Sequence, residues 1–118
     1  GEFGIRVLPV QADVNAQADN QAVVQSAVDQ VMAEFGRIDA LVNNAQASAS
    51  GVTIADHTTA QFDLALYSGL YAAFLLYAGV LPAPEGDEGS VVNFASGAGL
   101  FGNYGQCAYA AAKEASAA

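Results

Sequence analysis

Tyr109 and Lys113 stand four residues apart in the sequence Tyr-Ala-Ala-Ala-Lys, and Lys113 is the only lysine in the chain. Residues i and i+4 share one face of a helix, so we expect the ammonium to lie beside the phenol. A positive charge beside a phenol favours the phenolate form, and a phenol poised in this way can act as a general acid or base. The pair therefore predicts proton-transfer chemistry. The alternative is an accidental spacing, because short motifs also occur by chance.

The elements that must position this pair can be predicted from local patterns. Apolar and β-branched residues predict strands at 5–11, 38–42 and 90–95. Apolar residues at helical spacing predict a helix at about 19–35, which Gly36 would end. Thr58 and Gln61 fit a capping box that opens a second helix to about Leu81, where Pro82 and Pro84 would stop it. A third helix is expected from about residue 106.

Polar residues follow the ends of these predicted strands. Alternating strands and helices predict an α/β fold with a parallel sheet and covering helices. In such sheets ligands bind at the carboxyl ends of the strands, where Asp13, Asn43, Asn44 and Ser96 are found. Each residue alone has an ordinary structural explanation, as a helix cap, a turn residue or a strand end. Together with the tyrosine–lysine pair one loop further on, they predict a binding site at this edge of the sheet.

Composition limits the classes of protein that fit. The 118 residues suit one small domain, 53% of them are hydrophobic, and the net charge of −9 argues against nucleic acid or an anionic membrane as partner. The single cysteine, Cys107, excludes an internal disulfide and fits a reducing compartment, so we expect a cytoplasmic protein. One histidine and one cysteine argue against a transition-metal site.

Two segments could be mistaken for targeting or membrane signals. The uncharged apolar run at 64–81 is interpreted as a buried helix rather than a membrane span, because it contains Ser68, Gly69 and several small residues. No basic stretch followed by an apolar one opens the chain, so no signal peptide is expected. Residues 1–3 look like the remnant of a cloning junction.

The glycines at 97, 99 and 102 match the dinucleotide pattern G-x-G-x-x-G after a predicted strand. In that pattern the last glycine already belongs to the helix that receives the pyrophosphate. Here residues 103–105 prolong the segment, and no strand follows to offer an acid for the ribose. We therefore expect 97–105 to be a glycine-rich loop that shapes a pocket beside Ser96.

Taken together, these motifs resemble the short-chain dehydrogenase/reductase family over nearly the whole chain, from about residue 5 to residue 115. Ser96 precedes Tyr109 by thirteen residues, which is similar to the catalytic spacing of that family. The other matching segments are Asn43-Asn44-Ala45-Gln46 (resembling Asn-Asn-Ala-Gly), Tyr109 to Lys113 (Tyr-x-x-x-Lys), Asp13-Val14 and Gly36-Arg37-Ile38-Asp39. The resemblance implies a three-layer, partial Rossmann-like (doubly wound) parallel sheet of about three strands, in one domain spanning 1–118.

The resemblance also implies an activity, namely NAD(P)-dependent hydride transfer between a nicotinamide and a small alcohol or carbonyl compound. Tyr109 would pass a proton to or from the substrate oxygen, Ser96 would hold that oxygen, and Lys113 would favour the phenolate and bind the nicotinamide ribose. NAD or NADP would be the cofactor. The residues implied to contact it are Asp13, Val14, Asn43, Asn44, Ala45 and Lys113.

The chain departs from the family pattern in three ways. Gly69 stands where the family has a catalytic asparagine, with Ser68 as a partial substitute, and Gln46 replaces the last glycine of its motif. The chain also lacks the first two strands with their phosphate loop, and the region after the catalytic helix. That would leave a gap beside the strand at 38–42, filled either by the strand at 5–11 or by another chain, giving a homo-oligomer. The alternative function is a non-catalytic fragment that only folds and self-associates.

Overall fold

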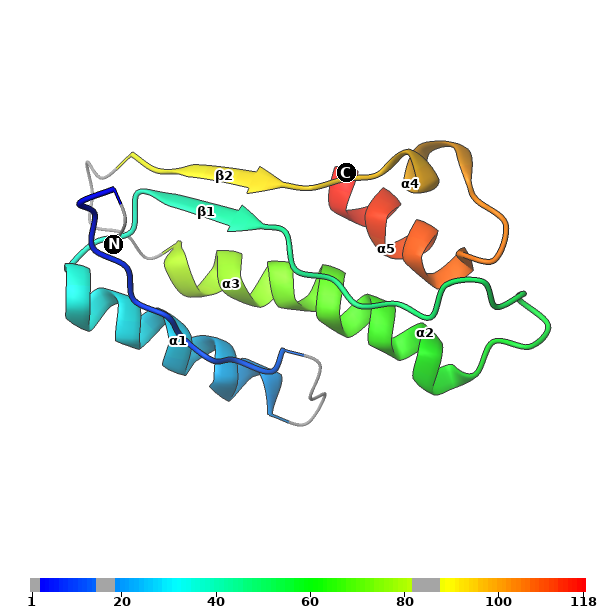
Figure 1. Ribbon diagram of the computed structural model, residues 1–118, viewed down its shortest axis with the longest axis horizontal. Helices are drawn as coiled ribbons and strands as arrows, with labels where there is room; N and C mark the ends of the chain where they lie inside the picture. The colour runs from blue at the N-terminus through cyan, green and yellow to red at the C-terminus, as the bar shows by residue number, and fades with distance from the viewer. Residues whose placement is uncertain (1–2, 15–18, 82–87) are drawn as a thin grey trace.

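The computed structural model describes residues 3–14, 19–81 and 88–118 (Figure 1). Two strands, β1 and β2, pair in parallel, with Ala40 opposite Ser90 and Asn43 opposite Asn93. This confirms the parallel α/β arrangement predicted from the sequence. The elements in chain order are α1 (Asn20–Phe35), β1 (Ala40–Asn43), α2 (Thr59–Ala65), the π-helical segment η1 (Leu66–Tyr71), α3 (Ala72–Val80), β2 (Ser90–Asn93), α4 (Gly97–Phe101) and α5 (Cys107–Ala117).

Helix α1 forms where the apolar periodicity predicts it. Val24 and Val28 are buried on the face that packs against α3. The helix ends at Gly36, whose φ of 76° is left-handed and whose N–H donates to the carbonyl oxygen of Met32 at 2.8 Å. Glycine adopts this conformation without the steric cost that a Cβ would impose.

The second predicted helix is also present, as the continuous run α2–η1–α3. Its capping box is formed: Gln61 N–H donates to Thr58 Oγ1 at 3.2 Å, and Thr58 N–H donates to Gln61 Oε1 at 2.9 Å. Within the described residues this helix, Thr59–Val80, is long and apolar enough to cross a membrane, which is weak evidence because core helices pass the same test. Pro82 and Pro84, the predicted stop, lie outside the described residues.

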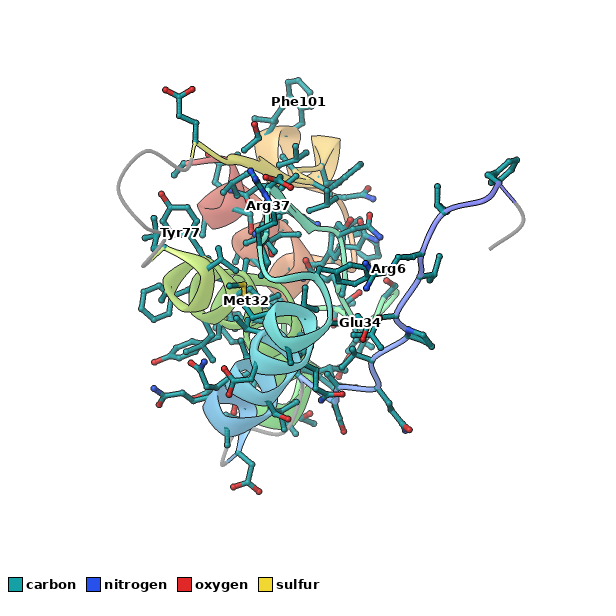
Figure 2. All side chains as sticks on the ribbon, turned by 90° about the vertical axis from the view of Figure 1, so that its left-hand side faces the viewer. Arg6, Met32, Glu34, Arg37, Tyr77 and Phe101 are labelled. Carbon is teal, nitrogen blue, oxygen red and sulfur yellow. The ribbon has the colours of Figure 1, made fainter. Side chains whose placement is uncertain are left out.

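The strand predicted at 5–11 is not formed. The segment runs alongside α1, and Figure 2 shows Arg6 beside Glu34. Arg6 Nη2 donates to the carbonyl oxygen of Glu34 at 2.9 Å and to Glu34 Oε1 at 3.0 Å, and its guanidinium lies 4.8 Å from the centre of the Phe35 ring. A strand forms only where a neighbour accepts its backbone hydrogen bonds, and this segment packs on a helix instead. The proposed pairing of 5–11 with the strand at 38–42 is therefore wrong, and the sheet of the described residues has two strands rather than three.

The helices α1, α3 and α5 lie on one side of the two strands, so the described residues form two layers rather than three (Figure 1). The long helix is the crossover between β1 and β2, and a crossover helix packs on one face of its sheet. The strands are correspondingly open to solvent, and Val42, Val91 and Val92 are all exposed.

The buried core is built from small side chains. Ala65, Ala72, Ala108 and Ala112 are buried where the long helix packs against α5. No large side chain is fully buried in the part of the chain that the structure describes. Alanine faces let the backbones of the long helix and α5 approach closely. This contact positions α5, the helix that carries Lys113.

The segment predicted as a glycine-rich loop contains the short helix α4. Ser96 caps it, since its Oγ accepts a hydrogen bond from Ala98 N–H at 3.2 Å. A Cβ on Gly99 would come within 2.8 Å of the Glu114 nitrogen, so the glycine allows α4 to pack directly on α5. Gly99 thus serves helix packing, and Ser96 provides the capping signal that starts the helix.

Candidate functional site

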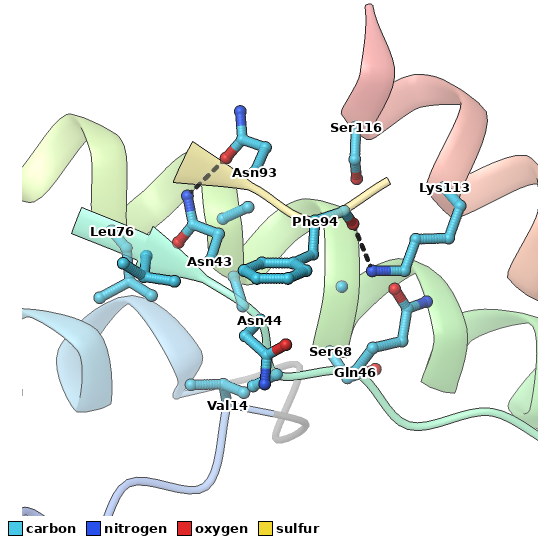
Figure 3. A pocket seen from close by; sticks show the side chains of 15 residues that line it. Val14, Asn43, Asn44, Gln46, Ser68, Leu76, Asn93, Phe94, Lys113 and Ser116 are labelled. Carbon is cyan, nitrogen blue, oxygen red and sulfur yellow. Dashed lines mark hydrogen bonds between the residues drawn. The ribbon is translucent and has the colours of Figure 1, made fainter. Parts of the chain in front are cut away.

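A cavity of about 70 Å³ lies at the carboxyl ends of β1 and β2 (Figure 3). Five of the six residues expected to contact a cofactor line it, namely Val14, Asn43, Asn44, Ala45 and Lys113. Asp13, the sixth, is exposed and does not line it. The structure therefore brings together residues from the N-terminal segment, the end of β1 and α5, at the edge of the sheet where the sequence predicted a site.

Asn43 forms one wall of this cavity. It is the last residue of β1 and lies directly opposite Asn93, and its Nδ2 donates to Asn93 Oδ1 at 2.8 Å. Among the described residues Asn43 Oδ1 is buried and has no hydrogen-bond partner. A buried acceptor without a partner is a candidate contact for a hydroxyl group or a water.

Lys113 enters the same cavity from α5. The residue is only 7% exposed, and its ammonium donates to the carbonyl oxygen of Phe94 at 2.6 Å, just beyond the end of β2. The ammonium lies 5.8 Å from the centre of the Tyr109 ring, so the two side chains are neighbours, as the helical spacing predicts. An ammonium carries three donor hydrogens, which leaves two for other acceptors.

Ser96 and Tyr109 do not line the cavity. Ser96 lies at the start of α4, and Tyr109 is half-buried on α5. No hydrogen bond joins these two side chains in the described residues. Ser96 Oγ accepts one bond from the backbone of α4 and keeps its own hydrogen for another acceptor. Their catalytic roles stay predictions.

Ser68 has a positioning role in the cavity wall. It is buried on η1; its Oγ accepts from Ala47 N–H at 2.9 Å and lies within hydrogen-bond distance of the carbonyl oxygens of Leu64 (2.6 Å) and Ala47 (3.1 Å). These contacts fasten the loop after β1 to the long helix. The hydroxyl is thus fully engaged, and it does not stand in for a side chain at position 69.

The sequence pointed to most of this site but missed Asn93 and Phe94. Asn93 ends its strand as Asn43 does, so the repeated asparagine at two strand ends was the available signal. Phe94 contributes a backbone carbonyl, which no side-chain pattern reveals. The described residues contain no group of three or more His, Cys, Asp or Glu side chains that could hold a metal ion.

Comparison with known proteins defines the class. The family model for short chain dehydrogenases matches residues 1–118. The chain belongs to this family.

Two characterised relatives are similar over nearly the whole chain. The chain is 56% identical over 112 residues to a 12alpha-hydroxysteroid dehydrogenase of Clostridium sp. (strain ATCC 29733 / VPI C48-50), covering 95% of this chain and 43% of that protein. It is 38% identical over 117 residues to the 2-(R)-hydroxypropyl-CoM dehydrogenase of Xanthobacter autotrophicus, covering 96% of this chain and 45% of that protein. The chain thus spans less than half the length of these relatives.

Solved structures agree with this assignment. NAD⁺-bound xylitol dehydrogenase superposes with a TM-score of 0.82 at 28% identity, over 97% of this chain and 43% of that one. ElxO with NADP bound superposes with a TM-score of 0.78 at 26% identity, over 90% of this chain and 42% of that one. The two strands and their helices therefore form part of a Rossmann-type fold.

The cavity fits one end of a nicotinamide cofactor. The buried Asn43 Oδ1 can accept from a ribose hydroxyl, and the Lys113 ammonium has hydrogens to donate to one. The residues present thus suit the nicotinamide ribose.

Proposed function

We propose that this chain forms the central part of an NAD(P)-dependent oxidoreductase that interconverts a secondary alcohol and a carbonyl compound. The observation that carries the proposal is the convergence of Val14, Asn43 and Lys113 on one cavity at the carboxyl ends of parallel strands. Family membership supports the reaction class. Because the chain spans less than half the length of these relatives, the activity of the whole protein is part of what we propose.

We assign a role to each site residue. Lys113 would bind the nicotinamide ribose while the carbonyl of Phe94 holds its ammonium in place, and Asn43 would accept from a ribose hydroxyl. The bound nicotinamide supplies the hydride exchange. Tyr109, whose ring centre lies 5.8 Å from the Lys113 ammonium, would transfer the proton to or from the substrate oxygen. Ser96 would donate its remaining hydrogen to that oxygen.

The substrate class follows from the relatives. We propose a small secondary alcohol or ketone and choose a 12α-hydroxysteroid as the first test compound, since the relative with that activity is 56% identical. Both NAD and NADP are tested, because one neighbouring structure holds each cofactor. We also propose a cytoplasmic location, because a single cysteine, Cys107, fits a reducing compartment.

The binding step can be tested on this chain by NMR. Nicotinamide mononucleotide, which carries only the nicotinamide and its ribose, is titrated against protein labelled with ¹⁵N-lysine and ¹⁵N-asparagine. We expect saturable shifts of the Lys113 and Asn43 side-chain signals, with NADH and NADPH giving the same shifts. Adenosine monophosphate, which lacks the nicotinamide end, is the matched control and should leave Lys113 unmoved. No saturable shift with any nicotinamide compound at millimolar concentration would refute the proposal.

The chemical step is tested by Tyr109→Phe. In a preparation that oxidises the hydroxysteroid, this variant should lose turnover by at least about a hundredfold, the usual contribution of a positioned acid–base group, while cofactor binding is retained. Turnover that survives the substitution would remove Tyr109 from the mechanism. The alternative, a non-catalytic self-associating fragment, is not favoured, because the chain belongs to the family and brings Val14, Asn43 and Lys113 to one cavity.

A further inference from the structure

Gln46, on the loop after β1, packs against Gly69 on the long helix. A Cβ built on Gly69 would lie 2.4 Å from Gln46 Oε1, 2.5 Å from its Cδ and 2.7 Å from its Nε2. Real Cβ atoms essentially never approach other atoms so closely, so a side chain at position 69 would force the Gln46 carboxamide to move. The two positions therefore share one space, which the loop fills and the helix leaves open.

The backbone at Gly69 does not itself require glycine. The residue lies inside η1, and its φ is outside the left-handed region in which Gly36 and Gly51 are found. Within a helix glycine is less favourable than alanine, because it loses more conformational freedom on folding. The feature that accounts for glycine at this position is the carboxamide beside it.

Hydrogen bonds hold the loop in this place. Gln46 Nε2 donates to the carbonyl oxygen of Ala65 at 3.1 Å. Ala47 N–H donates to Ser68 Oγ at 2.9 Å, and Ser68 Oγ donates to the Ala47 carbonyl oxygen at 3.1 Å. In the part of the chain that the structure describes, these are the hydrogen bonds that join 44–49 to another element. Displacing the carboxamide would thus remove one attachment of the loop to the long helix.

The same loop carries residues of the candidate site. Asn44 and Ala45 directly precede Gln46, and all three line the cavity, where Figure 3 shows Asn44 and Gln46. Residues 44–49 belong to no helix or strand. Their position therefore depends on the contacts of the loop with its surroundings, and those contacts are made by Gln46 and Ala47 on the long helix.

We propose that Gln46 is a positioning residue for Asn44 and Ala45, and that glycine at position 69 is its necessary partner. Two of the departures from the family pattern are then a single exchange, in which the side chain between loop and helix comes from the loop instead of the helix. What the loop binds rests on the proposed function. The coupling between the two positions does not, because it is present in the free chain.

A double-mutant cycle in the free chain tests this coupling. Gly69→Ala is measured by urea denaturation in the unmodified chain and in Gln46→Ala, where the carboxamide is absent. We expect it to raise the equilibrium constant for unfolding by at least about threefold more in the unmodified chain, as for other residues in contact. Equal effects in the two backgrounds would overturn the proposal. Should Gly69→Ala alone fail to fold, folding of the double variant supports the pair, and its failure refutes it.

Gly79→Ala is the matched control. Gly79 lies on α3 in the same long helix, and a Cβ there would meet Val28 Cγ2 at 3.3 Å rather than Gln46. The substitution brings the same change in helix propensity, so its effect on unfolding should be equal with and without Gln46→Ala. A coupling with Gln46→Ala as large as that of Gly69→Ala would refute a specific pair.

The position of the loop is followed by ¹⁵N-asparagine NMR of the free chain. The Asn44 side-chain amide signal should move in Gly69→Ala and stay in place in Gly79→Ala. Gly69→Asn combined with Gln46→Gly returns a side chain to the shared space from the helix, and should bring the signal back toward its original position. An Asn44 signal that Gly69→Ala leaves unmoved would contradict the positioning role.

Binding of nicotinamide mononucleotide supplies the last measurement. Gly69→Ala should weaken its affinity by about three- to tenfold, the change that corresponds to one lost hydrogen bond, and the exchanged pair should recover it. Affinity unchanged in Gly69→Ala would refute the positioning role. If the unmodified chain binds no nicotinamide compound, the proposed function fails, whereas the cycle and the Asn44 signal still decide whether Gln46 and Gly69 act as a pair.

Discussion

Asn43 and Asn93 face each other at the last paired position of β1 and β2, where Asn43 Nδ2 donates to Asn93 Oδ1 at 2.8 Å. This bond uses one of the two amide hydrogens of Asn43, a residue that lines the cavity, and fixes how its carboxamide is turned. A cross-strand pair thus sets the orientation of a group that we propose to contact the cofactor. Asn93, which was not predicted as a site residue, acts on the site through this bond.

Asn93→Ala should therefore disturb the site more than the fold. We expect a loss of about 0.5–1 kcal/mol in the free energy of unfolding, the usual net value of one partly exposed hydrogen bond, measured by urea denaturation. The Asn43 side-chain amide signal in ¹⁵N NMR should shift, because its donor loses its acceptor. Gln21→Ala, an exposed change on α1, is the control. An unmoved Asn43 signal would contradict the pairing.

Gly99→Ala should destabilise the contact between α4 and α5. The added Cβ would come within 2.8 Å of the Glu114 nitrogen and 3.0 Å of the Lys113 carbonyl carbon, and backbone atoms cannot turn aside as a side chain can. We expect a loss of about 1–3 kcal/mol, typical of overpacking, measured as a lower urea midpoint. The shift of α5 should also move the Lys113 ammonium signal.

Gly97→Ala is the matched control for this change. Gly97 belongs to the same short helix, and a Cβ there meets nothing within 4 Å. The variant should be neutral or slightly stabilising, because alanine favours helix over glycine. Equal effects of the two substitutions would show that helix propensity, and not close packing on α5, explains the glycine at position 99.

Thr58→Ala should weaken the start of the long helix. The substitution removes Oγ1, which accepts the Gln61 N–H, and so dismantles one half of the capping box. We expect a loss of about 1 kcal/mol in the free energy of unfolding. Thr59→Ala, at the exposed first position of the helix, should cost far less. A similar loss in both variants would indicate that the cap contributes nothing specific.

Elements specified by local signals were predictable from the sequence. The apolar periodicity and Gly36 gave α1, and Thr58 with Gln61 gave the start of the long helix, because caps and amphipathic faces act within a few residues. The strand at 5–11 failed for the opposite reason. A strand needs a neighbour, and the apolar segment found helix α1 instead.

In the site, too, features set by local sequence were predictable and features set by tertiary packing were not. The sequence placed Asn43 and Lys113 at one edge of the sheet, since strand ends and the i, i+4 spacing are readable from the chain. The packing of Gln46 against Gly69, where an added Cβ would lie 2.5 Å from Gln46 Cδ, was not predictable. Both residues could be recognised from the sequence as departures from the family pattern. Their contact could not, because it depends on how the loop after β1 packs on the long helix.

A cluster of aromatic side chains is exposed on one side of the long helix. Tyr71, Phe74 and Tyr77 lie at helical spacing, and all are exposed, Phe74 by 60%. Tyr71 stacks on Tyr67 with ring centres 5.0 Å apart and meets Phe74 edge-on at 6.1 Å, so the rings already form an ordered apolar surface. We propose that two copies of the chain associate here, since monomers rarely leave such surfaces open.

Phe74→Asp should then convert the chain from oligomer to monomer, because a carboxylate in an apolar interface loses its hydration without gaining a partner. Light scattering after size exclusion measures the mass directly. Phe101→Asp is the control: Phe101 is 88% exposed on α4 and belongs to no aromatic cluster among the described residues, so this variant should keep the mass of the unmodified chain. A monomeric unmodified chain would end the proposal, and dissociation by Phe101→Asp alone would move the interface to α4.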